Sequence, residues 1–269
     1  MASLPPIDVP RGAIGSGVFD APAEPGRDPA HHDYLLRLGD DALVLGQRLS
    51  EWCGHGPVLE VDISLANLAL DLVGQANLLL NDAGDGDRLA FHRDVLDFRN
   101  CLLVEQPNGD FAQTIARHFL YATWQHLLFQ RLTQSSDKFL SDFAHKAVKE
   151  VAYHRDLAAD WTIRLGDGTA ESSARMADGL DWCWRFVPEL FEVDDTLQAA
   201  IDQGIAPDPR EFEDEYRSSI KSVLETARLA APAEQRPILG GRRGHHSEHL
   251  GHLLAIMQFL PRTYPDASW

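Results

Sequence analysis

Apolar residues recur at steps of three and four over most of this chain. Three such stripes cover residues 35–52, 65–79 and 140–165. This spacing places apolar side chains on one face of an α-helix, and no stretch shows the sustained alternation that is typical of a β-strand. The sequence therefore predicts an all-α protein built as a bundle of long antiparallel helices.

Segments rich in glycine and proline separate these stripes and extend the prediction to the whole chain. Further helices are predicted over residues 88–105, 115–129, 171–191, 210–229 and 246–261. Residues 1–31 hold six of the 15 prolines, so we expect an extended or disordered arm there, or one that wraps a partner subunit. Residues 32–269 then form a single helical domain, which ends in additional C-terminal helices.

The balance of charge limits the classes of partner. Twenty-four Lys and Arg against 41 Asp and Glu leave a formal net charge of -17. Nucleic acid and anionic membranes attract basic surfaces, so neither is expected as a partner. No uninterrupted apolar run approaches the roughly 20 residues that span a bilayer, and the N-terminus does not resemble a signal peptide. We therefore expect a cytoplasmic protein.

Long helical bundles often hold a di-iron site, whose ligands include two Glu-x-x-His motifs. Among the 12 histidines, an acidic residue stands three positions earlier only in the pairs Asp28/His31 and Asp142/His145. The first pair lies in the predicted arm. His145 lies nine residues from the stripe residue His154, on the opposite side of its helix. The sequence therefore predicts the bundle without catalytic residues, bound cofactor or metal ligands of its own.

Polar residues nevertheless interrupt the apolar stripes. Gln75, His126 and His154 do so on three different helices, and Asp71 and Glu150 stand beside them. One interpretation is a degenerate metal site whose ligands have been replaced by a hydrogen-bond network. The other is a set of unrelated core residues, each with its own local partner. The candidate residues for a degenerate site are Glu51, Asp71, Gln75, His126, Glu150 and His154.

Two further clusters lie outside the stripes. Residues 245–252 contain four histidines and Glu248, which either bind a metal or belong to a helix that Ser247 opens. Arg93, Arg99 and Asn100, together with Arg242 and Arg243 in a glycine-rich loop, form a basic island in an acidic chain. Such arginines bind phosphate well, although a solvated or subunit-contacting loop has the same composition.

Several long strings in the chain resemble one known family. They are YLLRLGDDALVLGQRLSEWCGHGP (34–57), LANLALDLVGQA (65–76), RNCLLVEQPNGDFAQTIAR (99–117), KAVKEVAYH (146–154) and GHHSEHLG (244–251). They are similar, in order and spacing, to the C subunits of phenylacetyl-CoA ring 1,2-epoxidases. The resemblance runs from about residue 34 to Trp269, and only the N-terminal arm departs from it.

The resemblance implies a fold and a function. Members of this family are ferritin-like helical proteins, and the C subunit is the non-catalytic structural partner of a related A subunit that carries the di-iron centre. A small B subunit and a reductase with flavin, an iron–sulfur cluster and NADPH complete a monooxygenase. It epoxidises the ring of phenylacetyl-CoA in aerobic phenylacetate breakdown.

Coenzyme A carries phosphates, so the resemblance directs attention to the basic island. The expected CoA contacts are Asp97, Phe98, Arg99, Asn100, Arg242 and Arg243. We expect the first two helices, around the corner formed by residues 51–55, to contact the A subunit. Two alternatives stay open. One is a self-sufficient di-metal oxidase that uses ligands such as Glu51, Asp71, Glu150 and His154, and the other is a stand-alone CoA-ligand binding protein.

Overall fold

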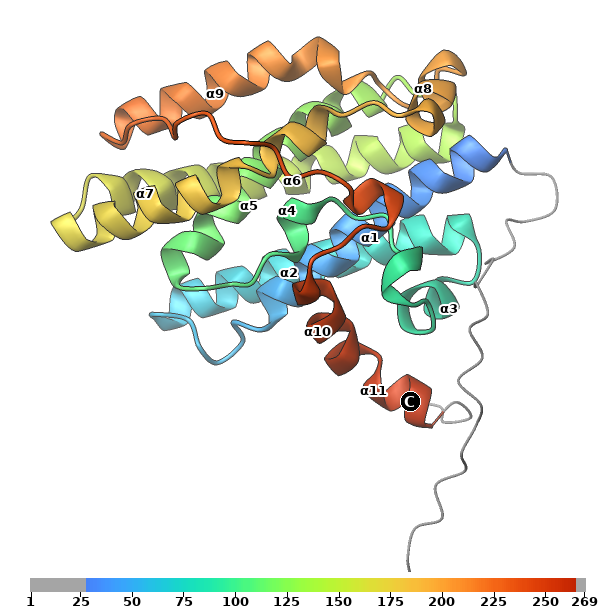
Figure 1. Cartoon of the computed structure of the whole chain (residues 1–269), viewed down its shortest axis with the longest axis horizontal. Helices are drawn as coiled ribbons and strands as arrows, with labels where there is room; N and C mark the ends of the chain where they lie inside the picture. The colour runs from blue at the N-terminus through green and yellow to red at the C-terminus, as the bar shows by residue number, and fades with distance from the viewer. Residues whose placement is uncertain (1–27, 265–269) are drawn as a thin grey trace, which may run out of the picture.

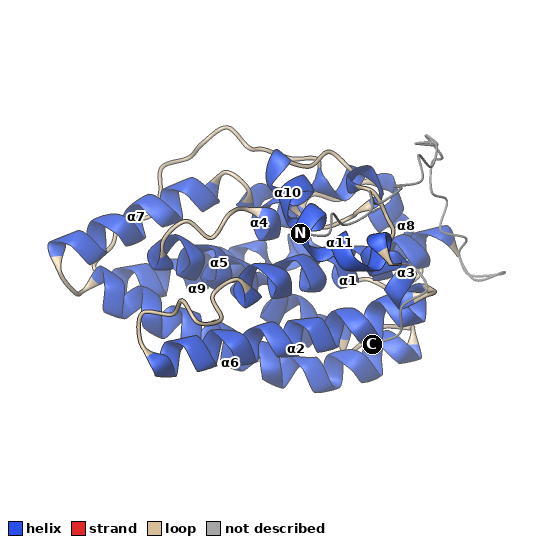
Figure 2. Ribbon diagram, turned by 90° about the horizontal axis from the view of Figure 1, so that it is seen from below, coloured by secondary structure: helices blue, strands red, loops and turns tan. Residues whose placement is uncertain are grey.

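The computed structural model describes residues 28–264, which form α-helices and 3-10 helices without a β-strand (Figures 1 and 2). Four long helices dominate: α1 (Pro29–Ser50), α2 (Leu59–Ala83), α5 (Phe111–Leu132) and α6 (Lys138–Gly166). α1 packs along α2, and α5 packs along α6. This arrangement confirms the all-α class and is consistent with a ferritin-like bundle.

The shorter elements surround these four helices. The α-helices among them are α3 (Gly86–Phe91), α4 (Leu102–Glu105), α7 (Ala170–Trp184), α8 (Asp195–Asp202), α9 (Glu213–Thr226), α10 (Glu248–Met257) and α11 (Phe259–Thr263). The 3-10 helices are η1 (Val95–Asp97), η2 (Val187–Phe191), η3 (Pro209–Phe212) and η4 (Gly241–Arg243). In Figure 1, α10 and α11 project from the body of the bundle.

Aspartates begin three of the long helices. Asp28, Asp110 and Asp137 each accept a hydrogen bond from a backbone N–H in the first turn of α1, α5 and α6. Such a cap satisfies a donor that the helix leaves unpaired, and replacing it with alanine costs about 0.5–2 kcal/mol. In α1, proline follows the cap at a position where its missing N–H is not needed.

The helical domain begins earlier than the sequence predicts. α1 starts at Pro29 rather than at residue 32, because Asp28 and Pro29 together form a helix start. The rest of the predicted arm, residues 1–27, lies outside the described residues.

α1 lies at the centre of the fold. Sixteen of its 22 residues are buried, and it contacts α2, α4, α8 and α10. A helix covered on so many sides has little surface left for another protein. Contact of α1 and α2 with a partner subunit stays a prediction, and the corner that follows α1 is exposed at Glu51, Cys53 and His55. Trp52, at the same corner, is instead turned inward, where its Nε1–H donates to Thr114 Oγ1 at 3.0 Å.

The single helix predicted over residues 88–105 does not form. The segment contains α3, η1 and α4, joined by extended backbone. Two neighbouring carboxylates on α1 explain the break. Asp40 accepts from the backbone N–H of Arg99 at 2.8 Å, and Asp41 accepts from that of Cys101 at 2.7 Å. These amide groups cannot also donate within a helix, so long-range hydrogen bonds replace the local ones.

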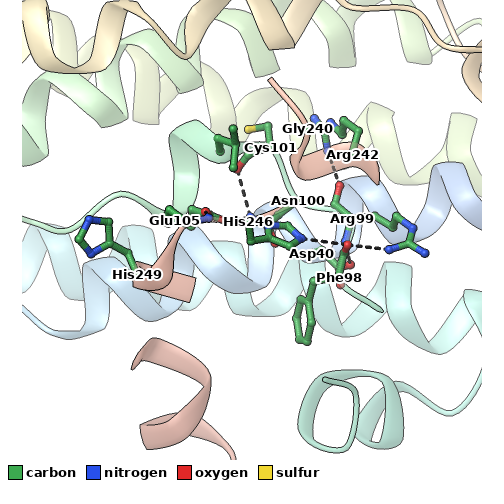
Figure 3. Close-up of polar contacts among 12 residues, drawn as sticks. Asp40, Phe98, Arg99, Asn100, Cys101, Glu105, Gly240, Arg242, His246 and His249 are labelled. Carbon is green, nitrogen blue, oxygen red and sulfur yellow. Dashed lines mark hydrogen bonds and ion pairs between the residues drawn. The ribbon is translucent and has the colours of Figure 1, made fainter. Parts of the chain in front are cut away.

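Both carboxylates are completely buried, and each is paired with an arginine. Arg93 binds Asp40, and Arg242 Nη2 lies 2.7 Å from Asp41 Oδ2. Arg242 also donates to the backbone oxygen of Arg99 at 3.0 Å (Figure 3). Burial opposes the charged guanidinium, but the Asp41 carboxylate raises the pKa of Arg242 above its ordinary value. The glycine-rich loop is therefore tied to the middle of α1.

Other predicted helices differ mainly at their ends. The helix expected over 171–191 ends at Trp184 and is followed by η2, which contains Pro188. The helix expected over 246–261 is interrupted at Gln258, whose side chain donates to the backbone oxygens of Ala90 and Arg93. The helix expected over 210–229 is η3 followed by α9, and α8 was not predicted.

α2 is the most apolar of the long helices. By its length and by the mean hydropathy of 1.4 of its most apolar stretch, it is the one described helix that could cross a membrane, and 44% of that stretch is buried within the chain. The sequence shows no uninterrupted apolar run here, because polar residues are scattered among the leucines of α2. A helix that packs in a protein core passes the same test. One face of α2 does pack on α1.

The buried pair of Asp41 and Arg242 provides a test of this architecture. Replacing Asp41 with Asn leaves the Arg242 charge buried without its partner, and we expect a loss of about 3–5 kcal/mol in the free energy of unfolding. The control is Arg243→Gln, which breaks an exposed pair with Glu192 and should cost less than about 1 kcal/mol. Urea denaturation measures both, and equal losses would contradict the central role of Asp41.

Candidate functional site

A chain of amide and carboxylate groups crosses the bundle where α2, α5 and α6 meet. Gln75 of α2 donates to Glu150 Oε2 of α6 at 3.0 Å. Gln125 of α5 donates to Gln75 Oε1 at 3.2 Å. Gln75 and Gln125 are both 2% exposed, so these bonds replace water that the side chains lost on folding. We call this region the polar seam.

An imidazole cluster continues the polar seam along the same helices. His154 of α6 is fully buried, and its Nε2 lies 3.2 Å from Asp71 Oδ2 of α2. The His118 ring of α5 lies 5.5 Å from the His154 ring, centre to centre. Neither nitrogen of His118 has a hydrogen-bond partner among the described residues. Burial lowers the pKa of His118 well below its ordinary value, so this ring is neutral at physiological pH.

The six residues considered for a degenerate metal site do not form one group. Asp71, Gln75, Glu150 and His154 lie together in the polar seam. Glu51 lies apart, at the end of α1, where it accepts from Arg48 and Asn108. His126 lies eight residues beyond His118 on α5, which is about 12 Å along a helix axis.

His118 and Gln125 were not among the predicted site residues. They lie seven residues apart on α5 and therefore share a face. The apolar stripe that the sequence indicates for α5 is a different one, which contains His126. Eighteen of the 22 residues of α5 are buried, so no single stripe identifies which of its faces meets α2 and α6.

The residues of the polar seam do not fit a di-iron centre. Such a centre needs a carboxylate from each of two helices and Glu-x-x-His from each of two others. The polar seam instead offers two glutamines, and its ligand-type side chains Asp71, Glu150 and His154 already hydrogen-bond to neighbours. Across residues 28–264, no three His, Cys, Asp or Glu side chains are grouped so that they could hold a metal ion.

The histidine-rich segment before α10 has a structural role in the fold. His246 is fully buried, with Nδ1 at 2.7 Å from Glu105 Oε2 and Nε2 at 3.1 Å from the backbone oxygen of Phe98 (Figure 3). The backbone N–H of Ser247 donates to the other Glu105 oxygen at 2.7 Å. Ser247 stands at the N-cap of α10, as predicted, although its hydroxyl makes no capping bond. The His246 side chain thus faces α4.

The six residues expected to contact coenzyme A differ in exposure. Phe98 and Asn100 are completely buried, and Arg242 is held by Asp41. Arg99 keeps 29% of its side chain exposed and lies 3.6 Å from Asp33. Arg243 is exposed and pairs with Glu192.

The carboxylate of Asp97 accepts from the backbone N–H of Asp94 at 3.1 Å at the start of η1. Contact of any of these six residues with coenzyme A stays a prediction. Arg243 is exposed and Arg99 is partly exposed, although Arg99 Nη1 already donates to the backbone oxygens of Leu96 and Phe98. These two arginines lie nearest to the surface and are the ones that could reach a phosphate without rearrangement of the core.

The pairing of His246 with Glu105 predicts a dependence of stability on pH. Burial disfavours the imidazolium, but the hydrogen bond and charge of Glu105, with Phe98 and Asp40 nearby, raise the pKa of His246 above its ordinary value. The stabilisation is therefore complete below about pH 6.5 and is lost as the pH rises through the raised pKa.

The variant His246→Gln keeps a hydrogen-bond donor but does not titrate. We expect the difference in unfolding free energy between the native chain and this variant to shrink as the pH rises from about 6 to 9. Urea denaturation at a series of pH values measures it. A difference that stays constant over this range would mean that the pKa of His246 is the same in the folded and the unfolded chain.

Comparison with known proteins assigns a family to this fold. The family model described as "Phenylacetic acid catabolic protein" matches residues 20–269. Over 242 residues the chain is 47% identical to a protein of Escherichia coli (strain K12) that is named as the C subunit of 1,2-phenylacetyl-CoA epoxidase. That alignment covers 88% of this chain and 98% of the relative. Matches of this extent confirm the resemblance seen in the sequence: the chain belongs to the phenylacetic acid catabolic protein family.

Proposed function

We propose that this chain is a subunit of a multicomponent epoxidase that acts on phenylacetyl-CoA in aerobic phenylacetate breakdown in the cytoplasm. The E. coli relative carries that activity in its name, and the two chains are 47% identical over nearly its full length. Within the complex the chain serves as the structural subunit. It supports a related A subunit that holds the di-iron centre, beside a small B subunit and an NADPH-dependent reductase with flavin and an iron–sulfur cluster.

The observation that carries the structural role is the composition of the polar seam. At the place where facing helices of such a bundle supply metal ligands, this chain has Gln75 and Gln125. An amide oxygen is a weaker ligand than a carboxylate and does not balance the charge of an iron ion. The chemistry of this residue set suits a hydrogen-bonded core better than a redox centre.

A hydrogen-bonded seam also explains how the chain could act as a rigid support. In a di-iron subunit, the metal ions tie facing helices together. Here the bonds from Gln75 to Glu150 and from Gln125 to Gln75 connect α2, α5 and α6 instead. Buried hydrogen-bonded networks of this kind favour one packing over others. A partner that docks on such a surface is held in one geometry, as a catalytic site requires.

The self-sufficient oxidase considered as an alternative gains no support from the geometry. Its proposed ligands included Glu51, which lies at the end of α1 and is bound by Arg48 and Asn108. Asp71, Glu150 and His154 do lie in the polar seam. The other polar side chains of the seam described above are the amides of Gln75 and Gln125.

The metal content of the separated subunits tests the structural role. We expect this chain, purified alone from iron-replete cells, to hold far less than one iron per chain by plasma mass spectrometry. The A subunit purified in the same way is the control and should hold about two irons, the number of a di-iron bundle. About two irons on this chain would instead assign the oxygen chemistry to it.

The same complex allows a test of the proposed CoA contact. We expect Arg99→Glu to raise the KM for phenylacetyl-CoA by about tenfold with kcat unchanged, because a repelled phosphate weakens binding without altering the reacting ring. The control is Arg217→Glu on α9, which makes the same change of charge at an exposed arginine. Equal KM values for the two variants would remove Arg99 from the substrate path.

A further inference from the structure

One face of α2 is exposed over most of the helix and carries four large apolar side chains, Leu59, Ile63, Leu70 and Leu78. At about 100° per residue, these four fall within a sector of about 100°. The other exposed residues of that sector are Glu60, Asn67, Gly74, Asn77 and Asn81. This is the face opposite to the one that packs on α1, and the described part of the chain leaves it open.

The exposure of this face is unusual for the surface of a helix. Leu59 is 71% exposed, Leu70 is 68% exposed, and Ile63 and Leu78 are each about half exposed. Single apolar residues on a surface need no explanation, but four large ones on the same face of a helix do. A Cβ atom added at Gly74 would meet no other atom within 4 Å, so packing inside the chain does not require glycine there.

A groove lies beside the exposed face, between α2 and α6, which run side by side in Figure 2. Its volume is about 480 Å³. Leu70 and Leu78 line it from α2, and Phe139 and Phe143 line it from α6. An apolar side chain that entered this groove would lose its contact with water, at a gain of about 25 cal/mol for each Å² removed.

The charges around the groove indicate what could fill it. Asp71, Asp142 and Glu150 line the groove, against one cation, Lys146. α2 itself carries four acidic residues and neither lysine nor arginine. A second copy of this chain would bring the same acidic rim and another net charge of -17. An anionic membrane would be repelled for the same reason. The complementary occupant has an apolar ridge bordered by basic side chains.

We propose that the exposed face of α2 and the α2–α6 groove dock a helix of the catalytic subunit, whose apolar stripe is flanked by Lys or Arg. The inference rests on the proposed function, since that function supplies a helical partner. Apolar side chains on one helix face beside a groove between two helices match the shape of a helix, as in other helix-in-groove contacts. Apolar contact would supply affinity, and the acidic rim would select the partner and its register.

The variant Leu70→Arg tests the docking surface. It places a cation in the middle of the exposed face, where a basic partner would be repelled, and 68% exposure of Leu70 means that the fold should tolerate it. We expect the Kd for the purified A subunit, measured by titration calorimetry, to rise at least tenfold. The control is Ile256→Arg on α10, which changes an equally apolar residue that is 79% exposed. That variant should bind like the native chain.

A second measurement needs no substitution. Hydrogen–deuterium exchange of the native chain, with and without the A subunit, should slow in the peptides that cover residues 66–80. Exchange in α10 should stay unchanged. For the Leu70→Arg and Ile256→Arg variants, circular dichroism spectra and melting temperatures establish that each keeps the native fold.

The outcomes separate the surface from the function. Suppose that the native chain and the Leu70→Arg variant bind the A subunit with equal Kd, and that α2 shows no slowing of hydrogen exchange. The proposed docking surface is then wrong, and the proposed function still stands. If the native chain does not bind the A subunit at all, both are wrong. If Leu70→Arg instead dissolves a homodimer in analytical ultracentrifugation, or abolishes flotation with phosphatidylcholine vesicles, the occupant is a second copy or a lipid surface.

Discussion

The fold depends on two adjacent carboxylates in the middle of α1. Asp40 and Asp41 are completely buried, and each binds an arginine and a backbone N–H of a segment far away in the sequence. Removing such charges from water is costly unless partners with good geometry replace the water. Every partner must therefore be in place at once, which fixes the course of residues 93–101 and of the loop that carries Arg242. These bonds join the first and last parts of the chain into one unit.

The polar seam, where α2, α5 and α6 meet, also depends on partners for buried polar groups. Such groups in the core of a helical bundle need hydrogen-bond partners or a metal ion. In a di-iron protein the metal satisfies them, whereas here amides do, with Gln75 bonded to both α5 and α6. Some polar atoms of this region stay unsatisfied: both ring nitrogens of His118, Nδ1 of His154 and Oε1 of Gln125 are buried without a hydrogen-bond partner among the described residues. An unpaired neutral imidazole costs less than an unpaired charge, and the low pKa of His118 keeps it neutral.

Several residues of the polar seam could be predicted from the sequence, but which residues lie together in space could not. The interruptions of apolar stripes by Gln75 and His154 identified two members of the polar seam, and Asp71 and Glu150 were found because they stand next to them. Glu51 was included wrongly, since a carboxylate at the end of a helix has no stripe to show its direction. Gln125 and His118 were missed because α5 is buried on nearly every side. The helical period gives the angle between residues of one helix, but it carries no information on which neighbour lies at each angle.

The sequence by itself determined the helical class, the approximate extents of the long helices and the absence of paired Glu-x-x-His motifs, because each of these depends on spacing within one segment. Only the tertiary structure decided that residues 88–105 break into short pieces, that α1 is central and that one face of α2 stays open. The reason is the same in each case. Local propensity favours a helix by a fraction of a kcal/mol per residue, whereas a buried carboxylate left without its partners costs several kcal/mol. Where the two conflict, as at Arg99 and Cys101, the long-range hydrogen bonds prevail.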